Sequence, residues 1–357
     1  MANNGGEQNL TSTLRKRIFS LPTLVSFGVA IIFLFFLATR FDLDWGQTWE
    51  SIRSMDPWQY LLALSLYYAS FYFRGIRWMI LSRSAGLNDT PGAKTPTVLQ
   101  FSQMIVMGWF VNSVAWLRAG DFYRAYALSD KARTSFSWSL GTIFAERIMD
   151  MATVMLIIVV GALAFVATSD LNSAGVLALG IAVGLAVLVI SALVLMKLYG
   201  VRLASRLPKR LEEKYQRFHL GTVGSFKQLP IPFVLSIIGW TLEIARLYFV
   251  VKALGFEIGI PLVIIVALGH AMLSTVPTPG GVGAVETGVT SLLLLGMTRH
   301  DAAAVAIVDR SITYLSVIII GGILFFLWQV ARSRSNRPSD TRRTPPLPGE
   351  QARADGG

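Results

Sequence analysis

The sequence predicts an all-α fold of the polytopic helical membrane class, with six full spans, two re-entrant hairpins and an inverted repeat. Three observations lead to this prediction: the composition, the distribution of basic residues between apolar segments, and a charge pattern that occurs twice. Hydrophobic residues make up 53% of the 357 positions, and the mean hydropathy is +0.55, above that of a water-soluble domain of this length. The bilayer is therefore the expected solvent, and no separate soluble catalytic domain is expected.

Eight apolar segments are long enough to cross, or nearly cross, a hydrocarbon core of about 30 Å. They lie at about residues 20–39, 57–81, 97–117, 137–167, 174–198, 230–254, 260–297 and 302–330. The third is interrupted near Asn112, and the seventh contains two prolines and three glycines between residues 276 and 283. Both interruptions free backbone groups that lipid cannot satisfy, so each is expected to be buried in protein or to line a wet cavity.

The positions of Lys and Arg predict the orientation through the positive-inside rule. Eight full spans fail this rule, because the loops on both sides of the third segment are basic and should both be cytoplasmic. If the third segment enters from the cytoplasm and turns back, and the seventh dips in from outside, every loop obeys the rule. The N- and C-termini are then both expected in the cytoplasm.

The expected organisation is one membrane domain at residues 15–332, with repeats at about 18–170 and 172–332. Residues 1–14 and 333–357 are expected to be disordered, because their composition cannot bury a core. Residues 200–229 carry apolar side chains at helical spacing among basic ones, which predicts an amphipathic connector on the anionic cytoplasmic leaflet. The net charge of +11 could indicate nucleic-acid binding, but the basic residues lie between and beyond apolar segments, so none is expected.

A pattern of charged residues and a broken helix occurs in both halves and supports the inverted repeat. Its acidic and basic members are separated by similar distances: Asp121 to Arg147 is 26 residues, and Glu286 to Arg310 is 24. Three spans and one hairpin in each half would invert the second half relative to the first. This is the plan of many secondary transporters.

Two groups of residues are candidates for function. The first could bind a lipid headgroup or phosphate, because guanidinium forks match phosphate oxygens and free amides at a helix N-terminus hold anions. It comprises Arg77, Asn112, Arg118, Arg124, Arg147, Arg310, Gly280, Gly281 and Gly283. The second consists of charged residues that are costly in lipid unless they are paired or face water, so they could couple an ion or form structural pairs. It comprises Asp121, Glu146, Asp150, Glu243, Arg246, Glu286 and Asp309.

Several alternatives stay open at this level. Glu286 could cap the following helix or pair with Arg310. Arg74 and Arg77 are interpreted first as side chains that snorkel to phosphates near a cytoplasmic helix end. The sequence has no cysteine, and its three histidines are too scattered to predict a metal site, so neither a metal nor a cofactor is expected.

These residues in this order resemble the lysylphosphatidylglycerol synthase transmembrane family, the flippase-like domain of the bacterial multiple peptide resistance factor and of many stand-alone proteins. The resemblance covers about residues 15–332. The matching elements are residues 74–78, Asn112, Arg118, Gly120, Asp121, Arg124, Glu146, Arg147, Asp150, Pro277, Pro279, Gly280, Gly281, Gly283, Glu286 and Arg310. Where the family often has Leu-Pro in the first hairpin, residues 113–116 read Ser-Val-Ala-Trp.

The resemblance implies translocation or handling of a charged lipid in a bacterial or archaeal cytoplasmic membrane. Aminoacylated phosphatidylglycerol and a polyprenyl-phosphate-linked sugar are the lipids it implies. Aminoacyl transfer is not implied, because in the family it belongs to a soluble domain that a stand-alone member lacks.

Membrane lipids are thus the expected partners, and a homodimer is left open. The alternative is a membrane-embedded transferase that acts on a lipid-linked donor, with Asp121, Glu146 or Glu286 as its base. No nucleotide-binding motif is found, so a translocator would be driven by an ion gradient or the lipid gradient, with Glu146, Asp150 and Asp309 as candidate ion carriers.

Overall fold

The computed structural model describes residues 45–90, 92–168 and 208–335, together with scattered positions between 184 and 205. Helices joined by turns make up these residues, which confirms the predicted all-α class for the part that is described. The predicted first span at 20–39, most of the segment at 174–198, residues 1–14 and residues 336–357 lie outside the described residues.

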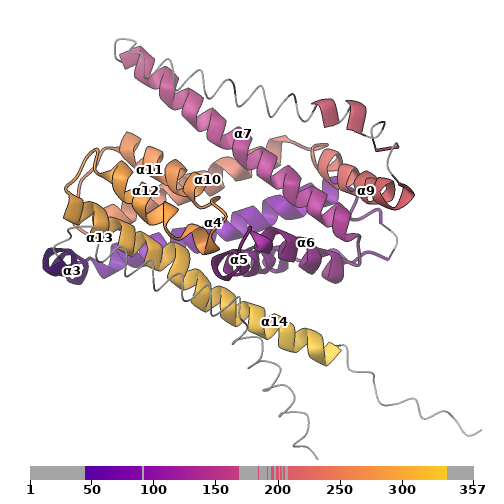
Figure 1. Cartoon of the computed structure of the whole chain (residues 1–357), viewed down its shortest axis with the longest axis horizontal. Coiled ribbons are helices and arrows are strands. Elements are labelled where there is room, and N and C mark those ends of the chain that lie inside the picture. The colour runs from indigo at the N-terminus through magenta and orange to yellow at the C-terminus, as the bar shows by residue number, and fades with distance from the viewer. Residues whose placement is uncertain are drawn as a thin grey trace, which may run out of the picture.

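Apart from the stretch between α7 and α9, most of which lies outside the described residues, the helices are joined by turns and short loops. In chain order they are α3 (Trp45–Arg53), α4 (Pro57–Ser84), α5 (Val98–Val114), α6 (Ala119–Ala132), α7 (Phe136–Thr168), α9 (Lys209–Ser225), α10 (Pro230–Ala253), α11 (Ile260–Leu273), the 3-10 turn η1 (Pro279–Gly281), α12 (Ala284–Leu293), α13 (Arg299–Arg310), the π-helical turns η2 (Ser311–Leu315) and η3 (Val317–Gly321), and α14 (Gly322–Ser335). The π-helical turns make α13 and α14 parts of one long helix (Figure 1).

Local sequence signals explain where several helices begin. Asp56 caps α4 by accepting a hydrogen bond from the Trp58 backbone N–H at 2.9 Å, and a proline follows at the first helical position. Thr97 and Gln100 form a reciprocal capping box at the start of α5.

Helix lengths separate two kinds of apolar segment. Among the described residues, two helices are long and apolar enough to cross a membrane, Pro230–Ala253 with 24 residues and Arg299–Ala331 with 33. The helices Val98–Val114 and Ile260–Leu273 are equally apolar in character but shorter, with 17 and 14 residues. At 1.5 Å per residue they extend only about 26 and 21 Å, and they are the first arms of the two interrupted segments.

The first interruption is a sharp reversal between α5 and α6. Leu117 and Arg118 both have positive φ, 58° and 53°, and α6 begins directly after them. Asn112 closes the reversal by accepting a hydrogen bond from the Gly120 backbone N–H at 2.8 Å. A Cβ atom on Gly120 would collide with the Gly108 carbonyl oxygen, so only glycine allows α5 and α6 to approach this closely.

The second interruption lies between α11 and α12. Gly280, Gly281 and Gly283 have φ values of 60°, 68° and 95°, a region that side chains with a Cβ rarely adopt. The glycines of this segment are therefore required by the backbone path around η1. This path brings η1 against α5 of the first half.

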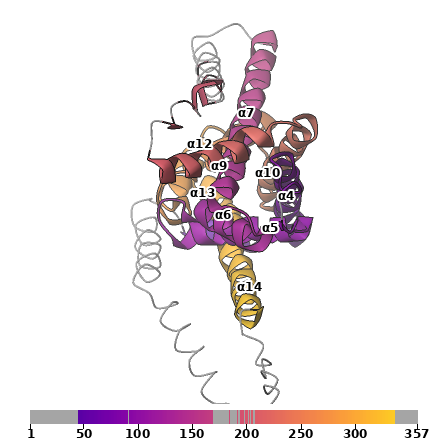
Figure 2. The same ribbon diagram turned by 90° about the vertical axis from the view of Figure 1, so that its right-hand side faces the viewer.

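The helices α4 and α10 pack along one another at the centre of the described structure (Figures 1 and 2). Helix α7 contacts both of them and also packs against α6 and α9. The largest side chains buried here include the arginines Arg77, Arg124 and Arg246, each no more than 2% exposed. Three arginines inside a helical core require charged partners, because an unpaired buried charge is very costly.

Candidate functional site

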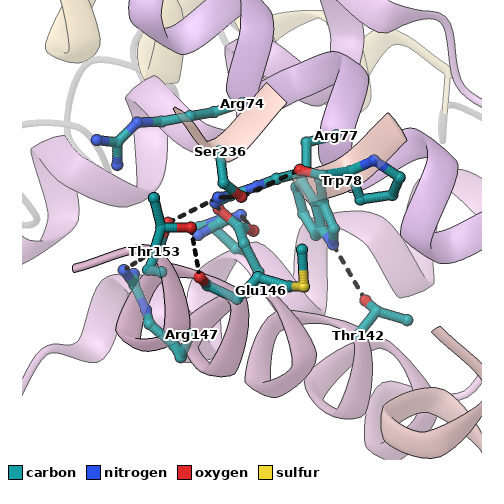
Figure 3. A network of polar contacts seen from close by, with 12 residues as sticks. Arg74, Arg77, Trp78, Thr142, Glu146, Arg147, Thr153 and Ser236 are labelled. Atoms are coloured by element: carbon teal, nitrogen blue, oxygen red, sulfur yellow. Dashed lines mark hydrogen bonds and ion pairs between the residues drawn. The ribbon is translucent and has the colours of Figure 1, made fainter. Parts of the chain in front are cut away.

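Arg77 on α4 joins three helices through the two terminal nitrogens of its guanidinium (Figure 3). Its Nη1 donates to Asp150 Oδ1 and to Ser236 Oγ, both at 2.7 Å, and its Nη2 donates to Glu146 Oε1 at 3.1 Å. The interpretation that Arg77 snorkels to the membrane surface is wrong, because its side chain is 1% exposed and faces protein. Both terminal nitrogens are already engaged, so Arg77 holds α4, α7 and α10 together.

Glu146 bridges two buried arginines. Its Oε2 accepts a hydrogen bond from Arg124 Nη2 at 2.5 Å, while Oε1 accepts from Arg77. The Arg124 guanidinium also lies 4.3 Å from the ring centroid of Trp78, whose Nε1 donates to Thr142 Oγ1 at 3.0 Å. Arg124 is thus neutralised and stacked inside the protein, and it ties α6 to α4 and α7.

The outer part of this cluster is more accessible. Asp121 Oδ1 accepts a hydrogen bond from Arg147 Nη2 at 2.7 Å, and the Arg118 guanidinium lies farther from Asp121, at 3.8 Å. The side chains of Arg118 and Arg147 are 28% and 25% exposed, in contrast to the nearly inaccessible Arg77 and Arg124. Of the four arginines in this cluster, Arg118 is held by the weakest contact with a carboxylate.

A second cluster has a similar arrangement on α4, α10 and α13. Glu243 lies between two arginines, with Arg74 Nη2 at 3.2 Å and Arg246 Nε at 3.3 Å. Arg246 also forms an ion pair with Asp309, and His270 Nδ1 on α11 lies 2.9 Å from Asp309 Oδ2. Glu243 therefore has the bridging position in this cluster that Glu146 has in the first. Arg74 is buried against protein as well, so snorkelling is wrong for it too.

Glu286 fixes the turn between η1 and α12. Its Oε2 accepts a hydrogen bond from the Gly283 backbone N–H at 2.8 Å, and its Oε1 lies 2.7 Å from Arg310 Nε. Both open alternatives, capping and pairing, therefore occur together. Arg310 Nη2 donates to the Gly280 carbonyl oxygen at 3.1 Å, and its guanidinium lies 4.5 Å from the Tyr314 ring centroid.

A small cavity lies where the two interrupted segments meet. Its accessible volume is about 40 Å³. Its lining comes from α5 and the following turn, α11 and the turn after it, and α13 with η2: Trp109, Asn112, Ser113, Arg118, His270, Ser274, Gly280, Arg310, Thr313 and Tyr314. The Tyr314 hydroxyl donates to the Ser113 carbonyl oxygen at 3.4 Å across this junction.

The charged side chains of the lining are positive. Arg118 and Arg310 bring guanidinium groups, and the ten lining side chains of the described structure include no carboxylate. Ser113, Ser274, Thr313 and Tyr314 add hydroxyl groups, each of which donates to a backbone carbonyl oxygen in this state and would have to rotate to donate to a ligand. Such a surface suits an anion with several oxygen acceptors.

The structure places the candidate residues from the sequence in two groups, one at the cavity and one in the ion pairs. Asn112, Arg118, Gly280 and Arg310 line the cavity, while Gly281 and Gly283 shape the turn behind it. The remaining nominated side chains lie outside the lining, in the ion pairs described above: Arg77, Asp121, Arg124, Glu146, Arg147, Asp150, Glu243, Arg246, Glu286 and Asp309.

Sequence reasoning missed Ser274, Thr313 and Tyr314 in the cavity lining and two participants in the ion-pair clusters. His270 is an ionisable residue within an apolar helix, and the cost of burying such a group was a signal that could have nominated it. Ser236, which accepts from Arg77, carries no such signal, because a single serine in an apolar helix usually bonds its own backbone, as Ser236 also does to Pro232.

Comparisons with known proteins show which family the chain belongs to. The family model for the lysylphosphatidylglycerol synthase TM region matches residues 23–321. A UPF0104 membrane protein of Methanocaldococcus jannaschii is 28% identical over 222 residues, which cover 61% of this chain and 94% of that protein. A second UPF0104 membrane protein, from Pyrococcus horikoshii, is 24% identical over 340 residues, covering 84% of this chain and 95% of that protein.

A longer relative is glycosyltransferase AglD of Haloferax volcanii, 25% identical over 354 residues. The match covers 87% of this chain but 55% of AglD, so the chain spans about half of that protein. The family model covers most of the chain and includes both interrupted segments. The chain therefore belongs to the lysylphosphatidylglycerol synthase transmembrane family of membrane proteins.

Proposed function

We propose that this protein translocates a lipid with an anionic phosphate in its headgroup, and that the phosphate binds between the two interrupted segments. The observation that carries the proposal is the cavity at their junction, where Arg118 and Arg310 face hydroxyl groups and no carboxylate lines the wall. An aminoacylated phospholipid and a polyprenyl-phosphate-linked sugar share the phosphate, so the site is assigned to that common group.

The proposed topology has six spans and two re-entrant hairpins in an inverted repeat, with both termini in the cytoplasm. Two observations support it. The helices α5 and α11 are too short to cross a bilayer and are followed by breaks. The bridging carboxylates, Glu146 in the first half and Glu243 in the second, each join two arginines, and Glu243 takes one of its two, Arg74, from the first half. In such transporters, substrate binds near the midplane where the repeats meet.

The arginines have different roles in this proposal. Arg118 and Arg310 line the cavity and would contact the phosphate, whereas Arg147 lies outside the lining and pairs with Asp121. Arg77, Arg124 and Arg246 are neutralised by buried carboxylates and would act as a rigid scaffold. The two cavity arginines also contact carboxylates, but only through Nε: Arg118 lies 3.8 Å from Asp121, and Arg310 lies 2.7 Å from Glu286.

Translocation requires the two hairpin tips to separate. The cavity of about 40 Å³ is far smaller than the roughly 300 Å³ or more of a typical ligand pocket. We therefore assign the structure to a closed state. In the open state the lipid phosphate would take the place of the tip contacts that Arg310 and Tyr314 make with Gly280 and Ser113.

His270 and Asp309 are the groups best placed to couple an ion to this movement. Their side chains lie 2.9 Å apart, and His270 also lines the cavity. Asp309 is held by Arg246 on its other oxygen. A proton on this pair would change the charge beside the bound phosphate.

Membrane-embedded transfer is the second candidate, because AglD is named a glycosyltransferase. The geometry gives it less support. The carboxylates nominated as its base, Asp121, Glu146 and Glu286, are each ion-paired with at least one arginine. A carboxylate committed to a guanidinium is poorly placed to accept a proton from a substrate.

A reconstitution assay tests the proposal. The purified protein is placed in vesicles with trace amounts of a headgroup-labelled anionic phospholipid or a labelled phosphatidylcholine, and loss of outer-leaflet label is followed after a membrane-impermeant quencher is added. We expect the protein to accelerate exchange of the anionic lipid more than that of phosphatidylcholine, because only the former leaves a net negative charge for the arginines. If the exchange rate in vesicles with the protein equals the rate in protein-free vesicles, translocation is refuted. A chemically altered lipid on chromatography would support transfer instead.

A further inference from the structure

We propose a second phosphate site, separate from the central cavity, formed by Arg133 and Arg217 where the α6–α7 turn meets α9. Its ligand is the phosphodiester of an anionic lipid at the membrane surface. The proposal is independent of translocation, since none of its residues lines the central cavity.

The site is a larger cavity than the central one. It has an accessible volume of about 440 Å³ and is lined by Thr90, Arg133, Thr134, Ser135, Trp138 and Arg217. These side chains offer two guanidinium groups, three hydroxyl groups and an indole, and none is acidic. Within the described parts of the chain, neither Arg133 nor Arg217 forms an ion pair.

This lack of partners distinguishes Arg133 and Arg217 from the arginines of the core. Arg74, Arg77, Arg124, Arg147, Arg246 and Arg310 all contact a carboxylate within 4 Å. The two arginines of the second cavity are therefore free to bind an external anion. Two guanidinium forks are the groups that bind phosphate oxygens best, and the Ser135 hydroxyl, which accepts from the Trp138 N–H, has its own hydrogen to add.

The backbone fixes Arg133 at the mouth of the cavity. It ends α6 in the left-handed conformation, with φ 57° and ψ 45°, and its N–H bonds the Ser129 carbonyl oxygen. The adjacent Ala132 carbonyl accepts a hydrogen bond from the Lys94 N–H at 3.0 Å. A non-glycine residue in this conformation costs about 1 kcal/mol or more, so the arginine stands where the backbone alone would favour glycine or asparagine.

Arg217 is fixed by close packing of α9 on α7. A Cβ atom on Gly221 would collide with the Trp138 carbonyl oxygen, and one on Gly141 would collide with the Phe218 carbonyl oxygen. Thr222 Oγ1 also donates to the Gly141 carbonyl oxygen at 3.2 Å. Since Arg217 lies one helical turn before Gly221, this crossing sets Arg217 beside Trp138.

The surroundings favour a lipid over free phosphate as the ligand. Trp138 fixes its ring by donating from Nε1 to the Ala85 carbonyl oxygen at 3.2 Å, and tryptophan beside arginine is typical of the membrane interface. Two large apolar side chains near the cavity residues in sequence are exposed: Phe136, which follows Ser135, and Leu220, three residues after Arg217. They would lie against acyl chains while the phosphate occupied the cavity.

Binding of short-chain phosphatidylglycerol to the purified full-length protein tests this site. We expect Arg217→Gln and Arg133→Asn each to weaken binding about tenfold, the equivalent of one charge-assisted hydrogen bond of about 1.4 kcal/mol. Asparagine is used at position 133 because it tolerates the left-handed conformation. Arg210→Gln is the matched control, since Arg210 is an exposed arginine on α9 outside the cavity lining, and we expect less than a twofold change.

A substitution that leaves the charge unchanged distinguishes a defined binding site from general electrostatic attraction between the protein and the lipid. Thr134→Val removes a hydroxyl group without changing charge, and we expect it to weaken binding about threefold. Each substitution should weaken binding by the same factor in the Arg118→Asn background, where the central cavity has lost one of its two arginines. Equal effects of Arg210→Gln and Arg217→Gln would refute the site, and so would unchanged binding in Arg133→Asn. Displacement of the lipid by inorganic phosphate at equal concentration would refute the assignment to a lipid.

Discussion

Glu146→Gln is expected to destabilise the protein by about 3 kcal/mol or more, the largest effect on stability that we predict. The carboxylate of Glu146 neutralises both Arg77 and Arg124, and all three side chains are at most 2% exposed. Glutamine keeps the shape but leaves Arg124 with only the longer contact to Asp121, at 3.8 Å. Removing one partner of a buried ion pair leaves the other charge desolvated and unpaired.

The measurement is the thermal unfolding midpoint of the purified protein in detergent. A loss of this size should lower the midpoint by roughly 6 °C or more. Glu257→Gln is the matched control, because Glu257 pairs only with Lys252 at the exposed surface, and no measurable shift is expected. An unchanged midpoint in Glu146→Gln would show that the buried cluster does not support the helix packing.

Arg118→Asn is expected to slow exchange of an anionic phosphate lipid by about 10- to 100-fold while leaving the unfolding midpoint unchanged. The size follows from losing a hydrogen bond between charged groups, which contributes about 1.5 to 3 kcal/mol. Stability should be retained, because Arg118 has only a 3.8 Å contact with Asp121 and is 28% exposed. Asparagine also tolerates the φ of 53° at this position.

The combination of a functional loss and a normal midpoint is informative, since a structural role would change both. Arg299→Gln removes the same charge from an exposed position at the start of α13 and should exchange lipid at the wild-type rate. If Arg118→Asn and Arg299→Gln behave alike, Arg118 does not contact the phosphate. Arg118→Lys should recover part of the rate, because it restores the charge but not the planar fork.

The sequence predicted the two interruptions well, because they depend on local chemistry. Gly280, Gly281 and Gly283 have positive φ, and the reversal after Asn112 ends α5 early. The pairing of Glu286 with Arg310 was one of two open alternatives, and the structure contains both. Backbone geometry of this kind is readable from Pro, Gly and Asn at particular positions.

The partners of the buried arginines could not be predicted in the same way. Arg77 contacts Glu146, Asp150 and Ser236, residues 69 to 159 positions away along the chain. Charge and hydropathy patterns place such residues in a segment but do not say which face each presents to its neighbours. This is why Arg77 was interpreted as a snorkelling side chain and His270 was passed over.

The same limit applies to the helix that follows Arg310. Residues 311–315 and 317–321 form π-helical turns, which often occur at functional sites. Their sequence is ordinary for a membrane helix, and no local signal marks them. The turns nevertheless place Thr313 and Tyr314 in the cavity lining beside Arg310.

Photolabelling with an anionic phospholipid that carries a diazirine beside its phosphate tests most directly whether the phosphate binds between the interrupted segments. Sites of attachment are mapped by mass spectrometry of the digested protein. We predict labels at residues 109–118, 270–280 and 310–314, and their loss both in Arg118→Asn and with excess unlabelled anionic lipid. Labels confined to other parts of the chain, or unchanged labels in Arg118→Asn, would contradict a phosphate site at this junction.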